Sequence, residues 1–346
     1  MNAQAGKITG VLVATILAVS ACGGGSSSTT PPPPGGTPPP VGGITRTGVA
    51  FAIGPVTGFG SVVVNGIRYD TSGAEFVVDG QVATQASLAV GDIVVIKGTM
   101  NDDNSNAVAT SVEFDDNVEG PVSSVDTAKE IIIVLGQTVH TVDAIFDDNC
   151  PATLPELLNV AAVEVSGSVR LDGSIDASRI ECKNVLGEME VTGKVSSLGT
   201  DTFMINALVV DYTDIPAMLD NFPSGAISAD DPVEAKGTTL GPNDELIATR
   251  VEFKGNRFDE NEGDHIEIEG FITRFGDAED FDVSDRPVTT IPGRTVYEGG
   301  TADDLGPNIK VEVEGEFDGA GTLVATKVEF KKSTAVRLTA DRKSVV

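Results

Sequence analysis

Tryptophan is absent from this 346-residue chain, histidine occurs twice and cysteine three times. So few cysteines exclude a scaffold dense in disulfides, and so few cysteines and histidines together exclude a Cys/His zinc cluster. Basic residues are also scarce, with 23 Lys and Arg against 52 Asp and Glu and a formal net charge of −29. Binding to nucleic-acid phosphates or to anionic lipid needs basic patches, so we expect no nucleic-acid partner.

Signs of catalysis are missing as well. A Ser/His/Asp triad needs a histidine base, but His140 alternates with apolar residues and is predicted to pack on a strand. His265 lies among acidic residues and is predicted to be solvated. No nucleophile elbow, phosphate-binding loop or His-Glu-x-x-His motif occurs. We therefore predict no catalytic residues, no cofactor and no enzymatic activity.

The amino terminus has the pattern of a secretory signal. Positive charge at Lys7 is followed by the apolar or small residues 8–18, a stretch shorter than the roughly 20 residues that span a bilayer. The next residues, Val19-Ser20-Ala21-Cys22, resemble the lipobox of bacterial lipoproteins, although the family usually has Leu where this chain has Val19. The alternative is an ordinary signal peptide with an incidental cysteine.

The lipobox resemblance implies that residues 1–21 are removed and that Cys22 is diacylated. The family uses Asp after this cysteine to retain lipoproteins in the inner membrane, and here the residue is Gly23. We therefore expect a lipid-anchored protein of the cell envelope, in the outer membrane on its periplasmic or surface face. Residues 22–45 follow as a Gly/Ser/Pro-rich linker that has no acidic residues.

Two strings of residues recur four times in the rest of the chain. One begins with alanine, as in Ala325-Thr326-Lys327-Val328-Glu329-Phe330, and its copies are 68, 71 and 77 residues apart. The other ends in glycine, as in Lys310-Val311-Glu312-Val313-Glu314-Gly315, and stands 10 or 11 residues before the alanine. Both strings alternate apolar and polar residues and enclose turn residues, so each pair predicts a β-hairpin. A weaker third marker, Gly54, Gly120, Gly193 and Gly270, opens each copy.

The strings predict an all-β chain of four tandem repeats of about 70 residues. Closing each sheet would remove exposed strand edges, so we favour small barrels resembling an OB-fold, packed end to end, over two-sheet sandwiches. Helical signal is limited to residues 154–162 and 215–221. The predicted segments are repeat 1 (46–117), repeat 2 (118–186), repeat 3 (187–263), repeat 4 (264–332) and a tail (333–346).

Together, the lipobox, linker and repeats resemble an uncharacterised family of bacterial surface proteins known only as a domain of unknown function, and the resemblance implies no activity. We expect a non-catalytic envelope lipoprotein that serves as a spacer or interaction platform, with a protein or glycan partner at the surface. One alternative is a surface protein that binds a ligand, a glycan or Ca²⁺. The other is a carboxylate-dependent hydrolase in repeat 3, whose insert spans residues 211–231.

Acidic loops and two cysteines are the remaining candidate features. Residues 102–106 and 259–264 are rich in oxygen ligands, but the second departs from a calcium loop in the position of its glycine, and both fit ordinary turns. We therefore predict no metal ligands. Cys150 and Cys182 both lie in repeat 2 and are predicted to form a disulfide in an oxidising compartment. The alternative is two separate thiols.

Overall fold

The computed structural model describes residues 49–101, 106–213, 219–255 and 261–332. The signal peptide, Cys22, the linker and the tail lie outside these residues. The described chain is all-β, as predicted, with three short 3-10 helices between strands. None of its helices has the length and apolar character needed to cross a membrane.

Repeat 1 is a closed five-stranded barrel. Antiparallel pairing joins β1 to β2 and β2 to β3, parallel pairing joins β3 to β7, and the antiparallel hairpin of β6 and β7 returns to β1. This closure is the predicted small barrel and excludes an open sandwich. The elements are β1 (Val49–Gly58), β2 (Val62–Val64), β3 (Ile67–Asp70), β4 (Glu75–Val78), β5 (Gln81–Ala83), η1 (Gln85–Ser87), β6 (Ile93–Met100) and β7 (Asn106–Phe114).

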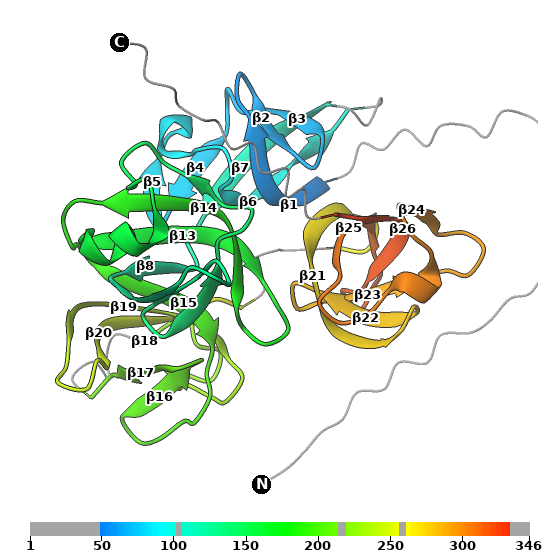
Figure 1. Cartoon of the computed structure of the whole chain (residues 1–346). Coiled ribbons are helices and arrows are strands. Elements are labelled where there is room, and N and C mark those ends of the chain that lie inside the picture. Colours follow the sequence, from blue (N-terminus) through cyan, green and yellow to red (C-terminus); the bar gives the residue numbers. More distant parts are fainter. Residues whose placement is uncertain (1–48, 102–105, 214–218, 256–260, 333–346) are drawn as a thin grey trace, which may run out of the picture. The chain divides into compact units, whose positions relative to one another are not determined.

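Repeat 4 closes in the same order, as its yellow-to-red ribbon in Figure 1 shows. The first strand β21 pairs with both β22 and β25, the hairpin of β25 and β26 follows, and β26 runs parallel to β23. The elements are β21 (His265–Asp277), β22 (Asp280–Val283), β23 (Arg286–Thr290), β24 (Val296–Glu298), η3 (Ala302–Asp304), β25 (Lys310–Phe317) and β26 (Leu323–Phe330).

Repeat 2 has the same pairing, but its first strand is divided at Pro121. The part before the proline, β8, pairs with β13, and the part after it, β9, pairs with β10. The elements are β8 (Val118–Gly120), β9 (Val122–Asp126), β10 (Ile131–Val134), β11 (Gln137–His140), β12 (Ile145–Phe146), η2 (Leu154–Asn159), β13 (Ala162–Val169) and β14 (Ile175–Lys183). The helical turn expected at residues 154–162 is thus η2.

Repeat 3 closes through a single bridge. Backbone hydrogen bonds of 2.8 Å run in both directions between Ser196, just after the first strand, and Met204 in β16. The elements are β15 (Met189–Lys194), β16 (Thr202–Ile205), β17 (Leu208–Asp211), β18 (Leu219–Asp220), β19 (Pro232–Leu240) and β20 (Leu246–Phe253). Helix was expected at residues 215–221, but the described end of that segment is strand β18, which pairs with β20.

The two sequence strings form a bulged hairpin in every repeat. The ladder shifts register at the recurring glycine, which then pairs with the recurring alanine: Gly98 with Ala109, Gly167 with Ala177, Gly237 with Ala248 and Gly315 with Ala325. The hydroxyl after the alanine donates to the carbonyl before the glycine: Thr110 to Lys97, Ser178 to Ser166, Thr249 to Lys236 and Thr326 to Glu314. The constant spacing of the strings is therefore that of a β-bulge.

The opening glycines have a different role. A Cβ atom at any of them would overlap a side chain in or beside the two-residue turn that follows: Asn65 for Gly54, Leu135 for Gly120, Ile205 for Gly193 and Ser284 for Gly270. Each first strand therefore passes close under the hairpin that it faces.

Barrels are joined in pairs that do not follow chain order. Strand β1 of repeat 1 runs parallel to β21 of repeat 4, and β8 of repeat 2 pairs antiparallel with β15 of repeat 3. The result is two 13-stranded sheets, and repeats 2 and 3 also share one apolar core. The expectation of barrels packed end to end was wrong, because the half of each first strand that its own barrel leaves unpaired is completed by another barrel.

Candidate functional site

The recurring glutamates stand opposite each other in three repeats, and a lysine bridges each pair. Glu164 faces Glu181, Glu234 faces Glu252 and Glu312 faces Glu329. Like charges that face each other across strands are destabilising. In repeat 4, the Lys331 ammonium lies 2.8 Å from Glu312 and 3.0 Å from Glu329, and in repeat 2, Lys183 does the same. In repeat 3, Lys254 contacts Glu234 at 3.2 Å and also reaches Asp115 of repeat 1 at 3.0 Å.

Replacing Lys331 with methionine tests this bridge. The apolar stem is kept while Glu312 and Glu329 lose their shared cation, so we expect the free energy of unfolding to fall by about 1–2 kcal/mol. Adding Glu312→Gln should restore most of the loss, because it removes the repulsion. The measurement is chemical denaturation of the wild type, both single variants and the double variant. Strictly additive effects of the two substitutions would contradict the bridge.

A second acidic group lies where repeats 1, 2 and 3 meet, and we call its members the junction acids: Asp79, Asp116, Glu119, Glu164 and Glu190. Three of them form a row across the sheet, because Glu119 in β8 pairs with Glu164 in β13 on one side and with Glu190 in β15 on the other. The two aspartates come from repeat 1, in the β4–β5 turn and in the segment between β7 and β8.

Carboxylate oxygens of the junction acids converge in two overlapping groups. One oxygen each from Asp79, Asp116 and Glu190 lies within 4.8 Å of the others, and so does one each from Asp116, Glu119 and Glu164. Asp116 belongs to both groups, and its side chain is the most buried, with 2% exposure. Among the described residues, its Oδ1 has no hydrogen-bond partner.

Positive charge at the junction is smaller than the negative charge. Among the described residues, two ammonium groups form ion pairs with junction acids: Lys183 with Glu164 at 2.6 Å and Lys236 with Glu190. Burial raises the pKa of Asp79 to about 6, that of Glu119 to about 7 and that of Glu190, which also lies beside Glu234, to about 9. Burial and then the charge of Glu190 raise the pKa of Asp116 well above its usual range. Five carboxyl groups are therefore held together against a strong electrostatic cost.

A cavity borders the junction. It has a volume of about 640 Å³, and its lining includes Asp115, Asp116, Asn117, Thr192 and Lys254. The backbone around Asp116 is fixed between repeats, since Asn117 donates its N–H to Val165 and accepts one from Thr192. The aspartates are thus held firmly beside an open space.

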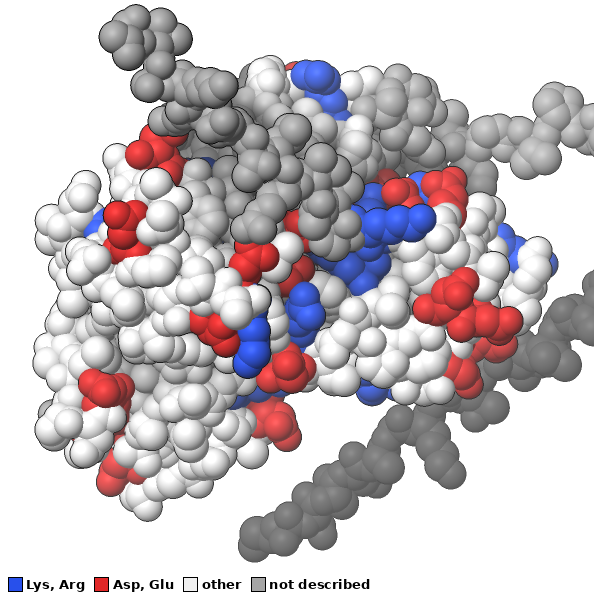
Figure 2. All heavy atoms as spheres, viewed as in Figure 1, with Lys and Arg blue, Asp and Glu red and all other residues white. Residues whose placement is uncertain are grey.

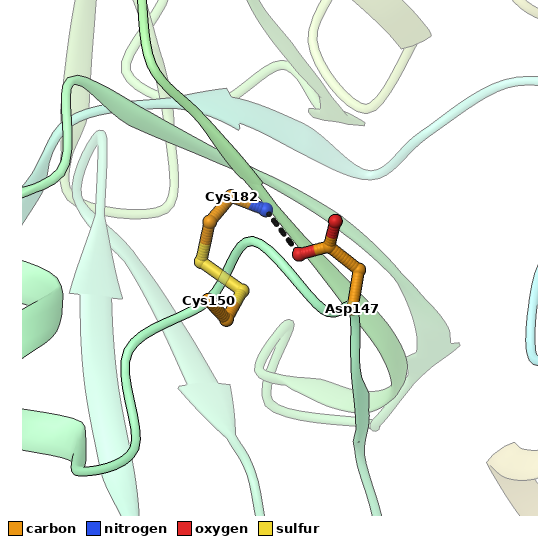
Figure 3. A group of neighbouring side chains, drawn as sticks. All are labelled: Asp147, Cys150 and Cys182. Atoms are coloured by element: carbon orange, nitrogen blue, oxygen red, sulfur yellow. Dashed lines mark hydrogen bonds between the residues drawn. A yellow bond between two sulfur atoms is a disulfide. The ribbon is translucent and has the colours of Figure 1, made fainter.

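Cys150 and Cys182 form a disulfide in repeat 2, with Cα atoms 5.0 Å apart (Figure 3). The neighbouring Asp147 accepts a hydrogen bond from the backbone N–H of Cys182 at 3.1 Å. The disulfide therefore ties the segment after β12 to the end of β14. Because both sulfurs are bonded to each other, this group offers no thiolate ligand.

The other predicted features have ordinary structural surroundings. His265 was expected to be solvated, which was wrong: it lies in β21 with 5% exposure. Within the loop at residues 259–264, the carboxylate of Asp264 accepts a hydrogen bond from the backbone of Asn261 at 2.9 Å, which closes a turn. Most of the other acidic loop, residues 102–105, lies outside the described residues. On the face shown in Figure 2, exposed acidic side chains are scattered and interspersed with Lys and Arg.

Comparison with family models identifies the repeats. A family described as a domain of unknown function, DUF5666, matches residues 49–113, 119–181, 192–252 and 269–329, which is more than half of the chain. The chain belongs to the DUF5666 family. Each match runs from the first strand into the closing strand of one barrel, so the DUF5666 domain here is the barrel itself. A search of curated proteins found no match to the chain.

The junction acids were not found from the sequence. Glu164 was visible as a member of a recurring string, but the other four lie at positions that look like turns or ordinary strand alternation. Their meeting depends on β8 pairing with strands of two different repeats. A cluster of acids in the segments between DUF5666 repeats was the one available signal, at Asp115-Asp116 and Glu188-Glu190.

Proposed function

We propose that this DUF5666 protein is a non-catalytic lipoprotein of the cell envelope, whose four barrels act as a spacer or interaction platform. The observation that carries the proposal is that the residues recurring in the repeats serve barrel construction. The glycine, alanine and hydroxyl build the bulge, the following Val or Ile is buried, and the glutamates share a lysine. No recurring residue in these strings is left over for chemistry on a substrate.

The amino-terminal sequence supports an anchor. The lipobox-like Val19-Ser20-Ala21-Cys22 is followed at once by the Gly/Ser/Pro linker, whose polyproline segments favour an extended chain. Two signals are commonly needed for stable anchoring, and diacylation at Cys22 would supply two chains. Gly23 in place of an aspartate favours the outer membrane.

Replacing Cys22 with alanine is expected to abolish membrane association, because the modified sulfur would be the sole attachment of the lipid. The measurement is fractionation of cells that express the wild-type or variant protein, with Cys150→Ala and Cys182→Ala together as the control that leaves Cys22 intact. We expect the control to sediment with membranes. If Cys22→Ala also sediments, the lipid anchor is wrong.

The role as a platform is tested by crosslinking in intact cells with identification of neighbours by mass spectrometry. We expect the four barrels to crosslink repeatedly to the same envelope proteins or glycan-linked proteins. Crosslinks confined to the chain itself would contradict a platform and leave a spacer.

A further inference from the structure

We propose that the junction acids bind a divalent cation with oxygen ligands, and that this cation is Ca²⁺. Asp116 and Glu190 would be its central ligands, with Asp79, Glu119 and Glu164 around them. The site would join repeats 1, 2 and 3, because each of them contributes at least one carboxylate. The inference does not depend on the lipid anchor or on the role as a platform.

The first argument is the unpartnered carboxylate at the centre. Asp116 is 98% buried by its 2% exposure, and its Oδ1 has no hydrogen-bond partner among the described residues. A buried polar atom without a partner is costly unless an ion or water completes it. Asp116 also contributes an oxygen to both converging groups, so the atom that lacks a partner belongs to the residue on which the other oxygens converge.

The second argument is the placement of like charges. Glu164, Glu119 and Glu190 stand in register on three neighbouring strands, an arrangement that repels. The recurring solution in this chain is a lysine between two glutamates, as Lys331 shows. At the junction, Lys183 and Lys236 serve the outer members of the row, Glu164 and Glu190. A cation of charge two at the centre would neutralise most of the remaining excess.

The third argument is the chemistry of the ligands. All five groups are carboxylates, which suit hard cations, with no thiolate or imidazole among them. Ligands of one Ca²⁺ lie about 2.3–2.6 Å from it, so two of them are separated by up to about 5 Å, which is compatible with the convergence observed here. Five carboxylates can supply the roughly six to eight oxygens that Ca²⁺ takes, whereas Mg²⁺ demands a tighter octahedron. The cavity beside Asp116 offers a path of entry.

Thermal unfolding of the whole protein, freed of metal with EDTA and then given about 1 mM Ca²⁺ or Mg²⁺, tests the site. We expect Ca²⁺ to raise the Tm by about 5 °C or more and Mg²⁺ to raise it clearly less. Calorimetric titration of the metal-free protein with Ca²⁺ should show saturable binding. A wild-type protein with no saturable binding and no change in Tm would overturn the proposal, and an equal shift with Mg²⁺ would overturn the assignment to Ca²⁺.

Asp116→Asn and Glu190→Gln are the decisive variants, and Glu75→Gln, an exposed acid in β4, is the matched control. In EDTA, each decisive variant should unfold at or above the Tm of the wild type, because a repelled buried charge has been removed. Each should lose at least half of the Ca²⁺-dependent shift, while the control keeps it. A full shift in both decisive variants would place Ca²⁺ elsewhere and overturn the site. If one decisive variant fails to fold, the other carries the same comparison.

Discussion

Alanine in place of Gly315 is expected to lower the free energy of unfolding by about 2–4 kcal/mol, a large effect for the addition of one methyl group. A Cβ atom at this position would overlap the backbone carbonyl oxygen of Val324 and press on Leu323. Both residues belong to the opposite strand of the bulged hairpin, β26. Backbone cannot turn aside as a flexible side chain can, so the hairpin would have to open or lose the bulge.

Gly306→Ala is the matched control, because it lies in the same repeat and a Cβ atom there would meet nothing within 4 Å. We expect its effect to stay within about 0.5 kcal/mol. The measurement is denaturation by guanidinium, followed by far-ultraviolet circular dichroism, with the midpoint of the repeat 4 transition compared among the three proteins. Equal midpoints for the two variants would show that the recurring glycine is not required by close packing. The equivalent changes at Gly98, Gly167 and Gly237 should act in the same direction, since each faces a carbonyl oxygen of its partner strand.

Removing the disulfide is expected to have the second large effect. Cys150 and Cys182 are 32 residues apart in sequence, and closing a loop of this length in the unfolded chain corresponds to about 3–4 kcal/mol in the chain-entropy model. The double variant Cys150→Ala, Cys182→Ala should therefore unfold at a clearly lower concentration of denaturant. An additional loss is expected at Cys182, because its side chain is buried at the position that Phe114, Phe253 and Phe330 occupy in the other repeats.

Reduction of the wild type separates the cross-link from the packing of the sulfurs. A reductant should shift the unfolding midpoint of the wild type toward that of the double variant and leave the double variant unchanged. If the reductant does not move the wild type although free thiols appear on assay, the bond contributes no stability. If it moves the double variant as well, the shift does not come from this disulfide.

The hairpins and the bulge could be predicted from sequence because their causes are local. Alternation of apolar and polar residues defines which side of a strand faces the core, and the partners of each closing hairpin lie close together in the chain. For the same reason, the distance from Gly315 to Ala325 was already visible as a constant spacing. The weak helical signal was less reliable: it held for η2 but not for Leu219 and Asp220, which pair with β20 instead.

The candidate site could not be predicted, because its members come from separate repeats. Asp79 and Asp116 look like turn residues in the sequence, and Glu119 and Glu190 look like solvated positions beside strand starts. His265 was misjudged in the same way, since acidic neighbours suggested solvent while the strand that contains it is covered. Each error arose because a polar side chain was judged by its neighbours in sequence, whereas its burial depends on which other barrel packs against it.

The sequence by itself determined the number of repeats, their all-β character and the hairpin that ends each one, because alternation, turn residues and the steric limits at glycine act over about ten residues. Only the tertiary structure decided that repeat 1 shares a sheet with repeat 4 and repeat 2 with repeat 3. The half-strands that make these contacts expose the same backbone donors and acceptors, so hydrogen bonding alone does not select a partner. The choice follows from which barrels can bury apolar surface together, and that choice also brings the five junction acids to one place.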